Sequence, residues 1–343
     1  MKKKLGVMLS VLLTSALLFT ACGSKQTSNS DEGSSKKESG KIMCIGSSTL
    51  APVVSKAGDT LKSKHGTWKK MNDKLTDENI EVSVSSGGSG AGVKAALEKT
   101  ANFGLISREV SKDEKAKMKE YNEIKLGYDA LTLSVNPQNP ILKNKKGFTS
   151  GEIQKIFSGE AKTWKDVDPS LPANKIVLVV RDAGGGAAKV FQKAVMGDKK
   201  VSKDAVQAPS MGALTQKVIE NKDAIGYASV GLVDQNKGKL IPMEVDNIAP
   251  TKENIASGKY KIARPLLLIK DGKLTGVEQT FVDFLKSEEG LKIIDESGFV
   301  SNKINLSLLE VLIYFNLYVN YISYFKLMIN VYILKWIRTS YPI

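Results

Sequence analysis

The sequence predicts an α/β protein built on mostly parallel sheets. Short apolar segments alternate along the chain with segments whose apolar residues recur at helical spacing. Residues 176–180 are an uninterrupted run of β-branched residues and leucine, which is typical of a strand buried on both faces. Three of the expected strands run into a Gly/Ser loop that opens a helix. With 343 residues, 42% of them hydrophobic, the chain is long enough for two domains of ordinary size.

The expected elements alternate through residues 41–300. We expect strands at 41–45, 81–85, 102–106, 130–135, 176–180, 224–228 and 264–269. We expect helices at 50–61, 93–97, 150–158, 190–195, 211–221 and 277–295. Each helix would pack one apolar face against a sheet.

The N-terminal end is expected to lie outside this α/β body. Residues 1–21 hold three lysines followed by an apolar run of 16 residues, which predicts a secretion signal. Phe19-Thr20-Ala21-Cys22 resembles the lipobox of bacterial lipoproteins, in which the cysteine is diacylated and becomes the new N-terminus; two acyl chains anchor a protein stably. A plain signal peptide with an incidental cysteine is the alternative. Residues 22–40 are polar and predict a flexible tether.

The C-terminal end has a different composition from the rest of the chain. Residues 301–343 contain no Gly, Ala or Asp and six of the ten tyrosines, so we interpret them as an aberrant apolar tail produced by a frameshift or stop-codon readthrough. A membrane helix is the alternative, but its longest uncharged stretch has 15 residues where roughly 20 are needed. Without signal and tail, residues 22–300 carry 43 basic and 35 acidic residues, a formal charge of +8 instead of +14.

Three Gly/Ser loops, at residues 46–49, 86–92 and 184–187, each join an expected strand to an expected helix. The first amides of a helix lack internal partners and lie at the positive end of its dipole. One such loop alone is an ordinary helix cap. Three of them, with Arg181 beside the third, predict a cradle for an anion. The body has only three arginines, whose planar guanidinium suits oxyanions: Arg108, Arg181 and Arg264.

Catalysis and nucleic-acid binding are poorly supported. Neither long glycine loop matches the phosphate-loop nucleotide motif, and no Gly-x-Ser-x-Gly elbow is present. The single histidine, His65, lies in a Lys-rich stretch at an expected helix end, and Cys44 is expected to be a small core residue. One histidine and two cysteines predict no metal and no cofactor. Basic residues scattered among acidic ones, without stacking aromatics, do not predict a nucleic-acid surface.

Six segments, in order, resemble the phosphate-binding proteins of the bacterial phosphate ABC importer. They are residues 46–52, 86–92, 103–108, 131–137, 156–164 and 181–187. The resemblance implies a two-lobed, periplasmic-binding-protein-like fold with two crossing strands at the hinge, near 130–135 and 262–267. It implies a first lobe of residues 41–130 plus 266–300 and a second lobe of residues 131–265, with the anion enclosed between them.

The resemblance also implies which residues bind phosphate. The family positions fall on Ser48, Thr49, Ser89, Ser107, Arg181, Gly185, Gly186 and Ala187. Asp182 is expected to orient Arg181. An acceptor atom at Ser107 or Asp182 would favour protonated phosphate over fully ionised sulfate.

Several of these positions depart from the family pattern. The family's Gly-Ser-Gly-Thr loop reads Gly184-Gly185-Gly186-Ala187, so two hydroxyls are lost, each worth about 1–2 kcal/mol. The family's aspartate ahead of the Phe-Gly pair is Asn102, and a serine expected before Ser107 is Ile106.

Together these features predict a binding protein and not an enzyme. We expect it to capture inorganic phosphate outside the cytoplasm and to deliver it to the permease subunits of an ABC transporter. It would act as a monomer anchored through Cys22 to the outer face of the cell membrane. The alternatives are another tetrahedral oxyanion such as sulfate, or a degenerate copy that binds nothing. A secreted phosphatase is the least favoured, because it needs a nucleophile or a metal cluster.

Overall fold

The computed structural model describes residues 39–302. The predicted secretion signal, Cys22, nearly all of the tether and residues 303–343 of the tail lie outside these residues. Between residues 39 and 302, no helix has the length and hydropathy needed to cross a bilayer.

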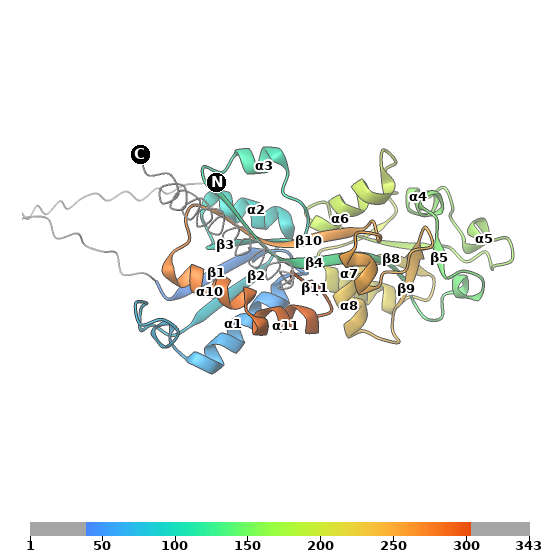
Figure 1. Ribbon diagram of the computed structural model, residues 1–343. Helices are drawn as coiled ribbons and strands as arrows, with labels where there is room; N and C mark the ends of the chain where they lie inside the picture. Colours follow the sequence, from blue (N-terminus) through green and yellow to red (C-terminus); the bar gives the residue numbers. More distant parts are fainter. Residues whose placement is uncertain (1–38, 303–343) are drawn as a thin grey trace, which may run out of the picture. The chain divides into compact units, whose positions relative to one another are not determined.

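The described chain alternates strands and helices as expected (Figure 1). The strands are β1 (Lys41–Gly46), β2 (Glu81–Ser86), β3 (Phe103–Ile106), β4 (Tyr121–Val135), β5 (Gly147–Phe148), β6 (Val177–Arg181), β7 (Val206–Ala208), β8 (Ala224–Ser229), β9 (Ile241–Val245), β10 (Ala263–Asp271) and β11 (Val300–Ser301). The α-helices are α1 (Ala51–His65), α2 (Gly88–Glu98), α3 (Lys112–Ala116), α4 (Ser150–Ser158), α5 (Trp164–Val167), α6 (Gly186–Phe191), α7 (Met211–Ile219), α8 (Val230–Gln235), α9 (Lys252–Ala256), α10 (Gly276–Lys286) and α11 (Glu288–Glu296). A π-helical turn, η3 (Gln192–Met196), continues α6, and two short 3₁₀ helices are η1 (Trp68–Lys70) and η2 (Pro140–Lys143).

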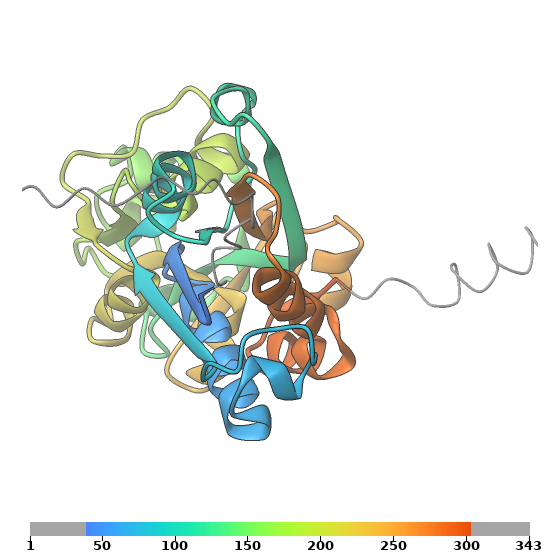
Figure 2. The same cartoon turned by 90° about the vertical axis from the view of Figure 1, so that its left-hand side faces the viewer.

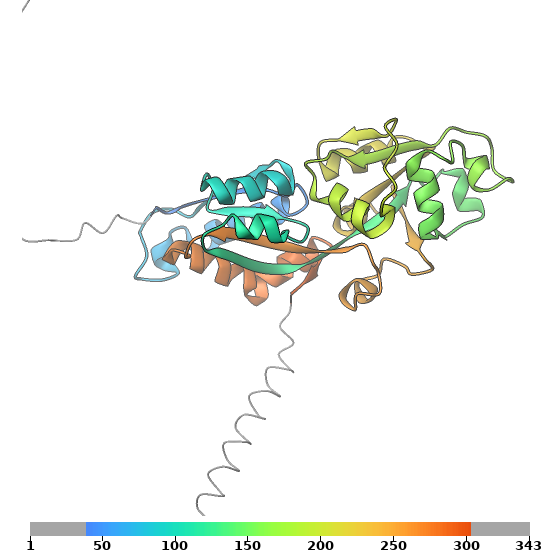
Figure 3. The same ribbon diagram turned by 90° about the horizontal axis from the view of Figure 1, so that it is seen from above.

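The first group of strands is β2-β1-β3-β10-β4, with β1 parallel to β2 and β3. Helices cover both faces of this group, as Figure 3 shows for α2 and α10. The alternation of side chains in β10 explains the two faces: Leu267 and Ile269 pack with Val93 of α2, whereas Leu266 and Leu268 join the main core. On the second face α1 lies alongside α11 (Figure 2).

Two long strands, β4 and β10, connect this group to the second group of strands. They pair antiparallel along the whole of β10, from Ala263 opposite Ala130 to Asp271 opposite Tyr121, with a bulge between Leu266 and Leu267. The remaining part of β4, residues 131–135, pairs instead with β8 and β9, and β8 continues to β6 and β7. The sheets are therefore mixed, and the expectation of mostly parallel pairing was wrong because the crossing strands run antiparallel to their neighbours.

The second group has its own aromatic core. Phe191 packs between Phe157 at 4.7 Å and Tyr227 at 4.4 Å between ring centroids. The predicted burial of the strand at 176–180 on both faces is confirmed, since its residues from Leu178 onward are all buried. One expected helix was wrong: residues 277–295 form two helices, because Ser287 has an extended backbone and its hydroxyl accepts the amide of Gly290 at the start of α11.

Candidate functional site

The second and third Gly/Ser segments contact each other directly. The expectation of a loop over all of residues 86–92 was wrong, because α2 already begins at Gly88, and Ser89 and Gly90 lie in its first turn. The amide of Gly90 donates to the carbonyl oxygen of Gly184 over 3.3 Å. Gly186 lies so close to Ser89 that a Cβ atom at position 186 would be 2.4 Å from the Ser89 hydroxyl oxygen. These segments form the starts of α2 and α6, so the contact brings together residues about a hundred positions apart.

The first loop follows β1 and is held by Ser47, a residue that the sequence analysis did not select. The Ser47 hydroxyl oxygen accepts the amides of Thr49 and Leu50 at 3.2 Å each. The same hydroxyl donates to the Ser107 hydroxyl oxygen over 2.9 Å, which connects this loop to the end of β3. Ser47 is thus occupied by the protein, and it fixes the backbone from which Ser48 and Thr49 project.

Arg181 ends β6 and reaches the first loop. Its side chain is only 3% exposed, and its Nη1 donates to the Ser48 hydroxyl oxygen over 3.1 Å. Nε donates to the Ala208 carbonyl, and Nη2 donates to the Pro209 carbonyl and to Asp182 Oδ1, at 2.9–3.0 Å. Four acceptors therefore fix the plane of the guanidinium, and one N–H of Nη1 remains for a ligand.

Position 185 has a close relation to this arginine. A Cβ atom on Gly185 would be 2.8 Å from both Cζ and Nη2 of Arg181. The guanidinium thus lies against the space that a side chain at position 185 would occupy. The Gly185 amide already donates to the Asp182 carbonyl oxygen over 3.0 Å, whereas Gly186 and Ala187 are in the first turn of α6, where amides lack intrahelical partners.

A second arginine, Arg264, lies behind the first loop, although the sequence analysis did not include it in the site. It is opposite Asp129 where β10 and β4 cross, and its Nε donates to Asp129 Oδ2 over 2.8 Å. Its Nη2 also donates to the Thr49 hydroxyl oxygen over 3.0 Å. Complete burial raises the pKa of Asp129, and the guanidinium of Arg264 opposes that effect. The rarity of arginine in this chain was the one sequence signal for this residue.

The hydroxyl groups of Ser48, Thr49 and Ser89 all accept hydrogen bonds from donors of the protein. Ser48 accepts from Arg181 and from the Met211 amide, and Thr49 accepts from Arg264. Ser89 accepts the Ser107 amide over 3.1 Å. Because a hydroxyl that accepts from fixed donors still has its own proton to give, Ser48 and Thr49 are set to donate to a ligand, and Ser89 can donate either to a ligand or to the Ser107 hydroxyl 3.4 Å away. Such a site suits a ligand with several acceptor oxygens and negative charge.

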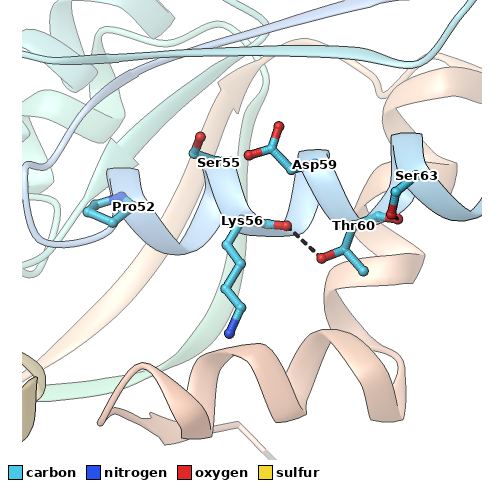
Figure 4. Close-up of a pocket in the computed structure, with 6 residues that line it drawn as sticks. All are labelled: Pro52, Ser55, Lys56, Asp59, Thr60 and Ser63. Atoms are coloured by element: carbon cyan, nitrogen blue, oxygen red, sulfur yellow. Dashed lines mark hydrogen bonds between the residues drawn. The ribbon is translucent and has the colours of Figure 1, made fainter.

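A groove of about 400 Å³ is lined by residues of several elements. Ser48 and Thr49 of the first loop and Ser86 at the end of β2 line it together with Ser210 and Gly212. The latter two residues are at the start of α7, whose N-terminus was not predicted to take part. A separate hollow on the outer face of α1, lined from Pro52 to Ser63, belongs to one helix and contains none of the predicted site residues (Figure 4).

The other reactive or charged side chains noted from the sequence, Cys44, His65 and Arg108, lie outside the three Gly/Ser segments. Cys44 is fully buried in β1, as predicted, and burial raises the pKa of its thiol. His65 ends α1, as predicted. Arg108 is buried, and its guanidinium forms a bidentate ion pair with Glu114 of α3 at 2.7 Å instead of facing the three Gly/Ser segments. Residues 39–302 contain no group of three or more metal-ligating side chains.

Comparison with known proteins identifies the class and then the family. Residues 31–289 match the model of the PBP superfamily domain, so the chain belongs to the periplasmic-binding-protein superfamily. Two solved structures are similar: a putative phosphate ABC transporter substrate-binding protein with bound phosphate from Clostridium perfringens and an ABC-type phosphate transport receptor from Vibrio cholerae. Their TM-scores are 0.66 and 0.58, each is 26% identical, and the matches cover 77% and 76% of this chain and 100% and 99% of theirs. The predicted two-lobed fold is thereby confirmed.

Within that superfamily the chain is a member of the PstS family. It is 32% identical to the phosphate-binding protein PstS of Staphylococcus saprophyticus over 83% of this chain and 86% of that protein. It is 31% identical to PstS of Staphylococcus haemolyticus over 88% of this chain and 93% of that protein. The resemblance noted from the sequence is thereby confirmed.

Proposed function

We propose that this chain captures inorganic phosphate between its two lobes and delivers it to the permease of an ABC transporter. The observation that carries the proposal is the set of hydroxyls at Ser48, Thr49 and Ser89, each of which accepts a hydrogen bond from the protein. Ser48 and Thr49 retain their protons for a ligand, whereas Ser89 also lies 3.4 Å from the Ser107 hydroxyl, and either of these two can donate to the other. Arg181, fixed beside Ser48, supplies the positive charge. The names of the relatives and of the similar structures support phosphate as the anion and transport as the purpose.

The phosphate ligands are proposed to be those expected from the sequence. They are Ser48, Thr49, Ser89, Ser107 and Arg181, with the backbone of Gly185, Gly186 and Ala187, and Asp182 in support. Gly186 and Ala187 lie in the first turn of α6, whereas the Gly185 amide would have to leave the Asp182 carbonyl oxygen to reach the anion. The lobes are proposed to be residues 41–130 plus 266–300 and residues 131–265. This division agrees with the change of partners in β4, which pairs with β10 up to Ala130 and with β8 from Leu131.

Selection of phosphate over sulfate is proposed to depend on Ser107. A protonated phosphate needs an acceptor, and the Ser107 hydroxyl oxygen lies inside the cluster of loops, 2.9 Å from Ser47 and 3.4 Å from Ser89. Asp182 is the poorer candidate, because it is 43% exposed and already accepts from Arg181. Asp129 is also a poor candidate for this acceptor, because its side chain is completely buried and is paired with Arg264.

The protein is proposed to work outside the cytoplasm as a monomer, attached to the outer face of the cell membrane by a lipid on Cys22. It is proposed to be a transport protein and not an enzyme. The absence of a metal-ligand cluster in residues 39–302 supports this over a phosphatase, as does the burial of Cys44.

Calorimetric titration of the chain without its secretion signal, first with phosphate and then with sulfate at neutral pH, tests the proposal. We expect submicromolar phosphate binding and no sulfate binding. Binding of sulfate alone would support the other-oxyanion alternative. A folded protein that binds neither anion would overturn the proposal and identify a degenerate copy that has lost function with the hydroxyls at Gly185 and Ala187.

A further inference from the structure

A buried ion pair lies at the place where β4 and β10 cross. The side chains of Arg264 and Asp129 are 1% and 0% exposed, and their strands hold them opposite each other. Asp129 Oδ2 accepts from both Nε and Nη2 of Arg264, and Oδ1 accepts the amide of Val230, at the start of α8, over 3.2 Å. One carboxylate therefore connects both crossing strands to a helix of the second lobe.

The arginine extends this connection into the predicted anion site. Its Nη2 donates to the Thr49 hydroxyl oxygen over 3.0 Å, and its Nη1 is 3.4 Å from the Ser107 carbonyl oxygen. Because Arg264 occupies an acceptor position of the Thr49 hydroxyl, the proton of that hydroxyl must point away from the arginine. Arg264 thus determines that Thr49 acts as a donor.

We propose that Asp129 and Arg264 form a positioning pair, which orients the Thr49 hydroxyl toward the bound anion and ties that orientation to the second lobe through the Val230 amide. The inference rests on the proposed function, since it concerns residues that hold the same site. Arg264 is proposed to act on the anion through Thr49 and not by binding it directly.

A purely structural ion pair would leave anion binding unchanged, and the chain contains a suitable example. The side chain of Arg108 is 5% exposed and forms a bidentate ion pair with Glu114, which belongs to the capping box of α3. Its hydrogen bonds go to Glu114 and to the Glu109 carbonyl, and none goes to a loop hydroxyl. Arg108→Lys is therefore a matched control for a buried arginine with a carboxylate partner.

The central experiment is a double-mutant cycle in phosphate affinity, measured by calorimetry on the chain without its secretion signal. Arg264→Lys keeps the charge, but one ammonium cannot serve Asp129 and Thr49 in the geometry of the guanidinium. Thr49→Val removes the hydroxyl at nearly constant shape. We expect each single variant to raise the dissociation constant for phosphate about tenfold or more. The dissociation constant of the double variant should be within about twofold of that of the single variant that binds more weakly. Arg108→Lys should leave affinity unchanged.

A second pair of variants tests the connection to the other lobe without altering the ion pair. Val230→Pro removes the amide that donates to Asp129, and proline is tolerated at the first position of a helix. Val230→Ala retains the amide. We expect the proline variant to bind phosphate several-fold more weakly than the alanine variant. If Arg264→Lys fails to fold, this comparison still decides the second half of the proposal.

These measurements distinguish failure of the proposed phosphate binding from failure of the positioning role of Asp129 and Arg264. A folded wild-type chain that binds no phosphate would refute the proposed function. Wild-type binding together with additive effects of Arg264→Lys and Thr49→Val would overturn the positioning role while leaving the proposed function intact. Equal affinities of the two Val230 variants would overturn the coupling to the second lobe.

Discussion

Adding one methyl group at Gly186 should weaken phosphate binding without destabilising the fold. The backbone of Gly186 lies in the first turn of α6, where alanine is a better helix former than glycine. The new Cβ atom would nevertheless be 2.4 Å from the Ser89 hydroxyl oxygen and 3.2 Å from the Ser107 carbonyl oxygen. Both neighbours belong to the other side of the site, so the methyl group opposes the contact between the loops.

The size of the effect follows from the cost of overpacking. Forcing an extra methyl into a tight contact costs about 1–3 kcal/mol. At 1.4 kcal/mol per decade, Gly186→Ala should raise the dissociation constant for phosphate about 5- to 150-fold. Calorimetric titration measures the constant, and thermal unfolding without ligand should show no loss of stability.

Gly184→Ala is the matched control in the same loop, because a Cβ atom at position 184 would meet nothing within 4 Å. It should bind phosphate like the wild type. Removing the obstructing oxygen tests the cause: in a Ser89→Ala background, Gly186→Ala should weaken binding by less than it does alone. Wild-type affinity of Gly186→Ala, or equal loss in Gly184→Ala, would refute the reasoning.

Three further predictions concern the other ionisable groups. Arg181→Lys should weaken phosphate binding more than tenfold in a calorimetric titration, because lysine cannot keep the four acceptors and the ligand together and each charged hydrogen bond is worth about 1.5–3 kcal/mol; a smaller loss would mean that the arginine is not a ligand. Partial burial raises the pKa of Glu114, but hydrogen bonds from Arg108 and Ser111 outweigh it and lower the pKa to about 2, so this pair should stabilise the fold fully above pH 4.5 and lose that effect as the pH falls toward 2. Urea unfolding should therefore show that the free energy of unfolding of Glu114→Gln falls less than that of the wild type between pH 4.5 and pH 2. The same fall in both proteins would contradict the prediction. In a Cys22→Ser variant, a thiol reagent should label Cys44 only at the rate of unfolding, since that thiol is fully buried; rapid labelling of the native protein would contradict the burial.

The local elements of the fold were predictable where one face of a segment is apolar. The strand at β6 was recognisable because consecutive β-branched residues indicate burial on both faces, and α1 was recognisable from its spacing. The first half of β4 was not predicted. The alternation of Ile124, Leu126 and Tyr128 with residues such as Lys125 is typical of a half-buried strand, so this element was missed although its pattern is present. Its pairing with β10, more than a hundred residues away, has no local signal in the sequence.

The site was predictable to the extent that it consists of strand-to-helix loops. A Gly/Ser segment at the start of a helix has the same chemistry wherever the chain places it, so Ser48 and Ser89 could be selected from the sequence as hydroxyls at such positions; that they bind an anion stays a prediction. The contributions of Arg264 and of the Met211 amide come from segments that reach the first loop only in the folded protein. No local pattern identifies such partners, although the scarcity of arginine had marked Arg264 for attention.

The departures from the family pattern differ in their consequences. Asn102 is integrated into this fold: its Nδ2 donates to the buried Glu278 Oε1 over 2.8 Å, and its Oδ1 accepts the Met43 amide. Aspartate there would remove the donor and bring two carboxylates within hydrogen-bonding distance, which disfavours both. Position 102 therefore gives no sign of decay.

Gly185 is different, because its replacement of a serine acts on the site itself. The missing side chain leaves space against which the Arg181 guanidinium packs, 2.8 Å from where a Cβ atom would be. The arginine is held there by Asp182 and by the Pro209 carbonyl. A serine at position 185 would have to displace part of that arrangement before its hydroxyl could serve the anion. We therefore expect Gly185→Ser alone not to strengthen phosphate binding, because its hydroxyl could reach the anion only after the guanidinium had moved.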